Sequence, residues 1–211
     1  MTYTVKAMNK NNTDNKSNFF ASVSRMKYID RWALMRNSWP ENLSEHSLEV
    51  AIIAHALCVI GNVRFGKNLN ADRAAVAGMY HDCAEILTGD MPTPIKYYSE
   101  EITDAYKKVE AVAEQTILKK LPEDIRPVYE KIFFSSDDEN EEYMRKLVKA
   151  ADKISALIKC IEEEKSGNTE FRSARATIGA AVDALCAKMP EVDEFVGEFM
   201  PSYESTLDEM S

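Results

Sequence analysis

Residues 77–85 read Ala77-Gly78-Met79-Tyr80-His81-Asp82-Cys83-Ala84-Glu85. The adjacent His81 and Asp82 stand inside an apolar run with helical spacing. An ionised Asp in such a place costs free energy unless a positive group compensates it. A divalent cation is the simplest compensation, because imidazole and carboxylate groups are both competent ligands for transition metals. The stretch makes His81 and Asp82 candidate ligands on a helix, but a His-Asp pair read alone is weak evidence for a metal site.

The rest of the chain shows helical periodicity. Its seven Gly and seven Pro fall between periodic segments, and no segment sustains the alternation typical of strands. We expect a flexible tail over residues 1–16 and a single all-α domain over residues 17–211. The expected helices run from Ser17 to about Arg31-Trp32, Asn42 to about Ile60, Asn70 to Leu87, Ser99 to about Thr116, Pro122 through Val128, Asp137 to Lys165 and Asn168 to about Leu185, with Pro190 as a stop and a last short helix around Phe195 and Phe199.

Two helix ends carry specific signals. Asn42 is placed as an N-cap, with Glu45 three residues later as in a capping box. Gly89 is placed as the C-cap of the helix that contains His81, and the prolines that follow prevent its continuation.

Composition excludes several classes of protein. The formal net charge is −9, which argues against binding of a nucleic acid polymer. The N-terminal residues lack an apolar leader, and the longest apolar stretch, Val50 to Ile60, is too short to span a bilayer. We therefore expect a cytoplasmic protein without a membrane partner. The four cysteines lack a C-x-x-C motif and are expected to be reduced, packed thiols: Cys58, Cys83, Cys160 and Cys186.

Two further residues are candidate metal ligands. His46 lies in the first turn of its helix, where its side chain can point toward another helix, although a surface histidine near a cap is the alternative. Asp152 lies at the edge of an apolar helical stripe, and its alternative is a solvated carboxylate paired with Lys149 or Lys153. His55 follows His46 by nine residues, a rotation of about 180° on a helix, so we expect it to be structural.

Together these residues form the order His … His-Asp … Asp on three separate helices, which the HD superfamily uses to build one metal site. Within that superfamily the chain resembles the bacterial YfbR-type 5′-deoxynucleotidases from about Phe19 to its C-terminus. The resemblance is carried by these stretches: Ile29-Asp30-Arg31-Trp32, Arg36-Asn37, Asn42-Leu43-Ser44-Glu45-His46-Ser47-Leu48, Met79-Tyr80-His81-Asp82-Cys83-Ala84-Glu85, Leu87-Thr88-Gly89-Asp90-Met91-Pro92-Thr93-Pro94 and Leu147-Val148-Lys149-Ala150-Ala151-Asp152. Cys83 is a mild departure from the small residues common at its position.

The resemblance implies an HD-domain helical bundle that forms a homodimer. It also implies hydrolysis of 2′-deoxyribonucleoside 5′-monophosphates to deoxynucleoside and phosphate by a metal-activated water. Carried over by position, one divalent cation per subunit is held by His46, His81, Asp82 and Asp152. Glu85 and Asp90 are implied as catalytic carboxylates. The implied substrate contacts are Arg31, Trp32, His46, Asp82, Asp90, Met91, Pro92, Thr93 and Asp152.

The residue types suit this chemistry. Four protein ligands leave open positions only on a five- or six-coordinate metal, which favours cobalt, manganese or similar ions over closed tetrahedral zinc. Glu85 follows His81 by four residues and Asp82 by three, so on one continuous helix all three share a face. We expect Glu85 to act as general base or proton shuttle, whereas an uninvolved surface Glu is the alternative.

The substrate-binding candidates are less specific. Arg31 can bind phosphate with a forked geometry that Lys cannot reproduce. Trp32 is either a wall that excludes a 2′-hydroxyl or a core aromatic residue. Asp90 can orient the sugar or protonate the leaving 5′-oxygen, and Lys96 is a further phosphate candidate.

Three alternative functions stay open at this stage. One is an HD phosphohydrolase for dNTPs, cyclic nucleotides or guanosine tetraphosphate, which requires more Arg and Lys than this chain has near Arg31, Arg36 and Lys96. The second is a non-catalytic interaction or metal-storage module, against which the presence of Glu85 beside the ligands argues. The third is an HD-type iron oxygenase, which needs ligands for a second metal.

Overall fold

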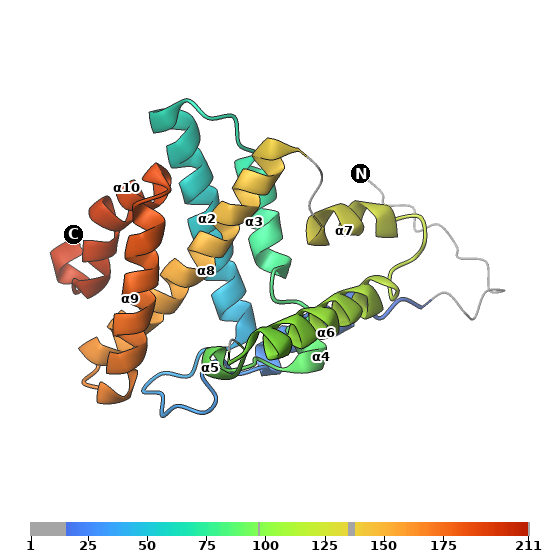
Figure 1. Cartoon of the computed structure of the whole chain (residues 1–211), viewed down its shortest axis with the longest axis horizontal. Helices are drawn as coiled ribbons and strands as arrows, with labels where there is room; N and C mark the ends of the chain where they lie inside the picture. Colours follow the sequence, from blue (N-terminus) through green and yellow to red (C-terminus); the bar gives the residue numbers. More distant parts are fainter. Residues whose placement is uncertain (1–15, 97, 135–137, 211) are drawn as a thin grey trace, which may run out of the picture.

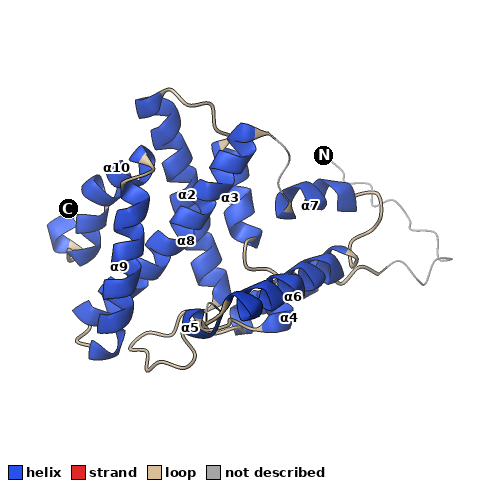
Figure 2. Ribbon diagram, viewed as in Figure 1, coloured by secondary structure: helices blue, strands red, loops and turns tan. Residues whose placement is uncertain are grey.

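A computed structural model of the chain describes residues 16–96, 98–134 and 138–210. The predicted all-α class is confirmed: the described residues form helices joined by loops, with no strand beyond an isolated antiparallel bridge between Asp30 and Asn42 (Figure 2). The α-helices are α1 (Phe19–Val23), α2 (Leu43–Phe65), α3 (Ala71–Tyr80), α4 (Glu85–Thr88), α5 (Thr93–Lys96), α6 (Glu100–Leu118), α7 (Arg126–Phe133), α8 (Glu139–Lys165), α9 (Arg172–Cys186) and α10 (Pro190–Glu198). Short 3-10 helices are η1 (Ser24–Tyr28), η2 (Thr169–Phe171), η3 (Met200–Glu204) and η4 (Asp208–Met210).

The helix α2 begins where the sequence predicts. The Asn42 side chain accepts the backbone N–H groups of Ser44 and Glu45, and the Glu45 carboxylate accepts that of Asn42, so the predicted capping box is confirmed. The helix continues past the predicted end at Ile60 and stops at Gly66, whose φ of 64° suits a left-handed C-cap.

The core is built around α2 and α8, which cross near the centre of the molecule (Figure 1). α3 and α10 also pack on α2, while α9 packs on α8. The buried apolar residues at the centre include Val50, Ile53, Leu57, Leu147, Ile154 and Ile158. A smaller cluster of Phe19, Cys83, Ile117, Leu118 and Leu121 joins α1 and α6 to the end of α3. Burying these side chains is the main stabilising contribution to the bundle.

α2 and α3 approach closely at Gly78. A Cβ atom on Gly78 would lie 2.7 Å from the Cα of Ala51, a separation that atoms do not tolerate. The glycine therefore allows the C-terminal part of α3 to lie directly against α2.

The prediction of one helix from Asn70 to Leu87 is wrong. The α-helical hydrogen-bond pattern is interrupted by a turn over residues 81–84, between α3 and α4, although His81 and Ala84 keep right-handed helical dihedrals. In this turn the backbone N–H groups of Cys83 and Glu85 bond to carbonyls three residues earlier, at 3.1 Å and 2.9 Å, instead of four. The predicted stop at Gly89 is confirmed, with a φ of 74° at the end of α4.

Smaller differences occur at the two ends of the chain. The first predicted helix ends at Tyr28, because Ile29 is extended and its carbonyl accepts the N–H of Leu43. Pro190 starts α10 instead of ending α9, since proline is tolerated in the first turn of a helix. Most of the predicted N-terminal tail lies outside the described residues, and the division of the chain at residue 16 stays a prediction.

One helix has the length and composition of a membrane span. Over the described residues this is α2, with a mean hydropathy of 1.6 in its most apolar window, so the apolar stretch is longer than the sequence analysis allowed. The same properties are common in central helices of globular domains, and α2 occupies that central position between α3, α8 and α10.

Candidate metal centre

Four side chains converge where the start of α2, the turn after α3 and the middle of α8 meet. They are His46, His81, Asp82 and Asp152, and one potential ligand atom from each lies within 4.8 Å of all the others. His46 Nε2 is 3.2 Å from Asp152 Oδ1 and 3.5 Å from Asp82 Oδ2. His81 Nε2 is 3.0 Å from Asp82 Oδ2. All four residues implied as metal ligands are thus brought together.

These residues fit a divalent transition-metal cation. The Nε2 atoms of His46 and His81 are buried and have no hydrogen-bond partner in the described part of the chain. Two imidazoles and two carboxylates form a donor set that such cations prefer. Burial disfavours a charged His81, yet the nearby Asp82 and Asp152 carboxylates outweigh burial and raise the pKa of His81 to about 9. The excess of negative charge that attracts this proton would equally attract a cation.

Each histidine is oriented by a hydrogen bond at Nδ1. His81 Nδ1 lies 2.8 Å from the carbonyl oxygen of Gly78, which accepts only, so this nitrogen carries a proton. His46 Nδ1 lies 2.9 Å from Ser155 Oγ on α8. Both rings therefore direct Nε2 toward the carboxylates.

Glu85 is adjacent to this centre but reaches it differently from the prediction. It begins α4 beyond the turn, so it does not share a continuous helix face with His81 and Asp82. Its side chain is buried, and Oε2 has no hydrogen-bond partner among the described residues. Burial, followed by the charges of Asp82 and Asp90, raises the pKa of Glu85 to about 9. A buried carboxyl group without a partner is poised to exchange a proton.

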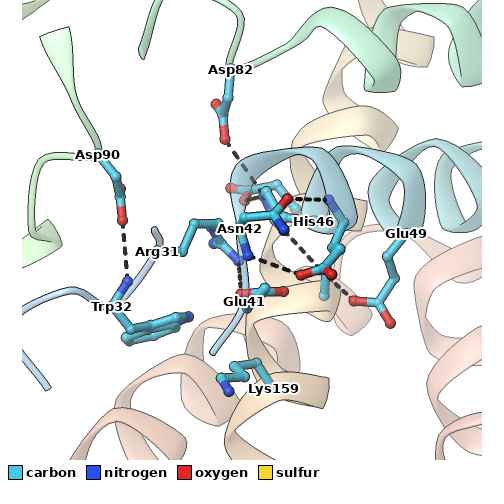
Figure 3. Close-up of polar contacts among 12 residues, drawn as sticks. Arg31, Trp32, Glu41, Asn42, His46, Glu49, Asp82, Asp90 and Lys159 are labelled. Carbon is cyan, nitrogen blue, oxygen red and sulfur yellow. Dashed lines mark hydrogen bonds and ion pairs between the residues drawn. The ribbon is translucent and has the colours of Figure 1, made fainter. Parts of the chain in front are cut away.

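Arg31, Trp32 and Asp90 form the neighbouring wall (Figure 3). Arg31 Nη1 donates to Glu41 Oε2 at 2.6 Å, and Glu41, Asp152, Asp82 and Asp90 together overcome the effect of burial and raise the pKa of Arg31. The backbone N–H of Trp32 donates to Asp90 Oδ2 at 3.3 Å. The two predicted substrate segments, around Arg31 and after Gly89, therefore face each other.

Trp32 has features of both roles that the sequence allows. Its φ of 57° lies in the left-handed region, which a bulky residue adopts only when its surroundings enforce it. Its half-buried ring lies 5.3 Å from the ring of Phe171, centroid to centroid. Its partial exposure is compatible with a substrate contact, and its contact with Phe171 is typical of a core aromatic residue.

The other candidates take ordinary positions. Met91 and Pro92 are half-buried, and Thr93 is exposed at the start of α5. Lys96 Nζ lies 2.7 Å from Glu110 Oε1. His55 stays apart from the ligand group, 3.8 Å from Asp72, as expected from its helical angle. All four cysteines are free thiols, and three are buried, which confirms that prediction.

Sequence reasoning missed the residues that support the site. The Glu163 carboxylate accepts the backbone N–H groups of Ser38 and Trp39, and Lys159 and Asn168 also donate to it, so it clamps the loop that follows Trp32 onto α8. The sequence carries only a partial signal of them: Ser155, Lys159 and Glu163 follow Asp152 by three, seven and eleven residues, which places them on one face of a helix but does not identify their partners.

Comparison with known proteins gives consistent results. The family model described as 5′-deoxynucleotidase YfbR-like matches residues 18–203. A 5′-deoxynucleotidase of Vibrio vulnificus is 48% identical over 196 residues, covering 93% of this chain and 99% of that protein. The 5′-deoxynucleotidase YfbR of Escherichia coli is 45% identical over 196 residues, covering 93% and 96%.

Solved structures share the fold at lower sequence identity. An HD-domain phosphohydrolase from Listeria innocua superposes with a TM-score of 0.76 at 22% identity, covering 90% of each chain. The cyanophage S-2L HD phosphohydrolase DatZ, solved with dA and one catalytic Zn²⁺, superposes with a TM-score of 0.61 at 19% identity, covering 88% of this chain and 96% of that one. These likenesses confirm the predicted HD-domain helical fold.

Proposed function

The chain belongs to the YfbR-like 5′-deoxynucleotidase family, and on that premise we propose that it hydrolyses 2′-deoxyribonucleoside 5′-monophosphates to deoxynucleoside and phosphate. The observation that carries the proposal is the convergence of His46, His81, Asp82 and Asp152 beside the buried carboxyl group of Glu85. Metal ligands next to a carboxyl group that can exchange a proton are the parts that hydrolysis of a phosphate monoester requires.

One divalent cation per subunit would be held by His46, His81, Asp82 and Asp152. When bound, it would supply positive charge to the phosphate and lower the pKa of a coordinated water. The open positions needed on a cation with four protein ligands favour cobalt or manganese. Zinc is added to the candidates because the DatZ structure holds one catalytic Zn²⁺.

The charged side chains of the site favour phosphate binding only when such a cation is bound. Asp82, Glu85, Asp90 and Asp152 bring carboxyl groups to the surroundings of Arg31. This balance repels a phosphate dianion, so substrate binding requires added positive charge. Arg31 is anchored by Glu41, and a guanidinium has enough donors to bind a phosphate oxygen as well.

Glu85 and Asp90 are the proposed proton carriers. With a pKa of about 9, Glu85 holds a proton at neutral pH in the absence of a cation, and a neighbouring positive charge would release it. Its carboxylate would then accept a proton from the attacking water. Burial also raises the pKa of Asp90. We propose that Asp90 either orients the sugar or protonates the leaving 5′-oxygen.

We assign the preference for a deoxy sugar to the wall formed by Arg31, Trp32 and Asp90. The backbone strain at Trp32 and its contact with Phe171 hold the indole in one place. A rigid ring there would exclude a 2′-hydroxyl, and the segment Asp90-Met91-Pro92-Thr93 would close over the sugar.

The test is phosphate release from matched dAMP and AMP by metal-stripped protein resupplied with cobalt, manganese or zinc. We expect turnover of dAMP that depends on the added metal, with little turnover of AMP. Equal turnover of both substrates would contradict the role of Trp32. Release of phosphate without any metal would contradict the metal-dependent mechanism.

We also propose a cytoplasmic homodimer that pairs through α2. This helix is apolar on all sides, yet Leu48, Ile52, Val59 and Val63 on one face are 38% to 78% exposed. Their spacing is symmetric about the point between His55 and Ala56, so an antiparallel partner would place Leu48 against the partner subunit's Val63. That arrangement also places the N-terminus of each α2 beside the C-terminus of the other. Glu45 near one end and Arg64 near the other carry opposite charges, so the two ends attract each other. Free thiols agree with a reducing compartment.

Light scattering coupled to gel filtration tests the interface. We expect a dimer for the parent protein and a monomer for Ile52→Glu. The matched control is Val112→Glu, which charges an equally exposed apolar residue on α6 and should leave the dimer intact. A monomeric V112E protein with a dimeric I52E protein would move the interface to α6, and a monomeric parent would contradict the dimer.

A further inference from the structure

A chain of hydrogen bonds leads from His46 into the protein. His46 Nδ1 lies 2.9 Å from Ser155 Oγ, and Ser155 Oγ donates to Glu49 Oε2 at 2.6 Å. The side chains of His46 and Ser155 are fully buried. We call these three residues the relay. It links α2, which carries His46 and Glu49, to α8, which carries Ser155 and Asp152.

The relay determines which nitrogen of His46 carries a proton. A serine hydroxyl can donate one hydrogen bond, and Ser155 donates it to Glu49. Toward His46 the Ser155 oxygen therefore acts as an acceptor. His46 Nδ1 must then be the donor. The neutral ring is left with its lone pair on Nε2, the atom that faces Asp82 and Asp152 without a hydrogen-bond partner in the described structure.

We propose that Ser155 and Glu49 are positioning residues that hold His46 in the tautomer and orientation required of a metal ligand. The proposal rests on the metal site described under the proposed function. Without Glu49, the Ser155 hydroxyl can turn and donate to Nδ1, which places the ring proton on Nε2 and blocks coordination. Partners of this kind typically change metal affinity about 10- to 100-fold.

The relay differs from the arrangement at His81. There, Nδ1 donates to a backbone carbonyl, that of Gly78, and no side-chain substitution removes this acceptor. At His46 the acceptor is a hydroxyl whose direction depends on a second side chain. The tautomer of His46 is therefore open to mutation, while that of His81 serves as an internal reference in the same molecule.

The experiment titrates metal-stripped protein with Co²⁺ and follows its visible absorption, alongside ¹⁵N shifts of the histidine rings in the metal-free protein. Glu49→Leu and Ser155→Ala should each weaken Co²⁺ binding about 10- to 100-fold. Glu49→Gln keeps an acceptor oxygen for Ser155 and should stay within about threefold of the parent. In the E49L protein the His46 ring proton should shift toward Nε2, while His81 keeps its Nδ1 proton.

Controls separate this role from packing and from net charge. Glu162→Leu removes an exposed carboxylate near Glu49 that does not belong to the relay, and this variant should bind Co²⁺ like the parent. Equal weakening by E49L, E49Q and E162L, or an unchanged His46 tautomer in E49L, would overturn the proposal. A parent protein that binds Co²⁺ but does not hydrolyse dAMP would contradict the proposed substrate but not the relay. A parent that binds no Co²⁺ would overturn the metal site and the relay together.

Discussion

The metal centre has two halves of different construction. The helix half consists of His46 and Asp152, which lie within the continuous helices α2 and α8. The turn half consists of His81 and Asp82, which lie in the break between α3 and α4. Both halves bring their ligand atoms to one point, but only the helix half uses regular secondary structure to do so.

The difference shows what a break in a helix can provide. On a continuous helix, adjacent side chains point about 100° apart, so neighbouring residues do not share one target. In the turn half the consecutive residues His81 and Asp82 converge, with their side-chain atoms 3.0 Å apart. The turn also starts a new helix at Glu85. The helix half thus supplies rigid placement, whereas the five residues 81–85 bring together two ligands and the carboxyl group that we propose as a proton carrier.

The largest expected effects come from substituting one residue in or next to each half, which separates metal binding from catalysis. Asp152→Ala removes a ligand of the helix half and should weaken metal binding by more than about 100-fold, beyond the effect of outer partners. Glu85→Gln, next to the turn half, should keep the metal and lower turnover by about 10²- to 10⁴-fold. Metal titration and dAMP hydrolysis on the same samples test both, and equal metal loss in the two variants would contradict the division of roles.

A second prediction concerns Glu163, which lies on α8 eleven residues after Asp152 of the helix half. Hydrogen bonds from Lys159, Asn168 and the backbone of Ser38 and Trp39 outweigh burial and lower the pKa of Glu163 from 4.5 to about 2. The ionised form therefore stabilises the fold above pH 4.5, and this contribution is lost as the pH falls toward 2. Glu163→Gln leaves the buried Lys159 without its counter-charge and should cost about 3–5 kcal/mol at pH 7.

Urea unfolding between pH 3 and pH 7 would measure this effect. The free energy of unfolding of the Gln variant should fall less steeply with acidification than that of the parent. Glu123→Gln, at an exposed position before α7, is the matched control and should follow the parent. A variant with the parent's pH dependence would show that the clamp does not contribute.

The smallest expected effect tests what holds the turn half. Gly78→Ala places a Cβ against the backbone of Ala51 and should destabilise the protein by about 1–3 kcal/mol. Gly179→Ala is the control, because a Cβ there meets nothing within 4 Å and alanine favours helix, so stability should rise by up to about 1 kcal/mol. Thermal unfolding of both variants measures these changes in stability. A G78A protein as stable as the parent would mean that α3 can move away from α2 without a cost in free energy.

The two halves also differ in how well the sequence predicts them. The capping box at Asn42 and the apolar stripe around Asp152 locate the helix half, because caps and periodicity are local signals. The His-Asp pair identifies the ligands of the turn half, but the break after Tyr80 has no local signal such as a proline or a capping residue. The relay and the Glu163 clamp join residues more than one hundred positions apart, which spacing along the chain does not reveal.

α8 carries one functional group after another along a single face. Asp152 lies beside His46, Ser155 contacts the other side of the same ring, and Lys159 and Glu163 hold the loop that follows Trp32. Each residue of an α-helix turns the next by about 100° and advances it by about 1.5 Å. Inserting or deleting one residue between Asp152 and Glu163 would therefore rotate the clamp away from its loop while the ligand stayed in place. The number of residues between Asp152 and Glu163 is therefore as important to the site as the side chains themselves.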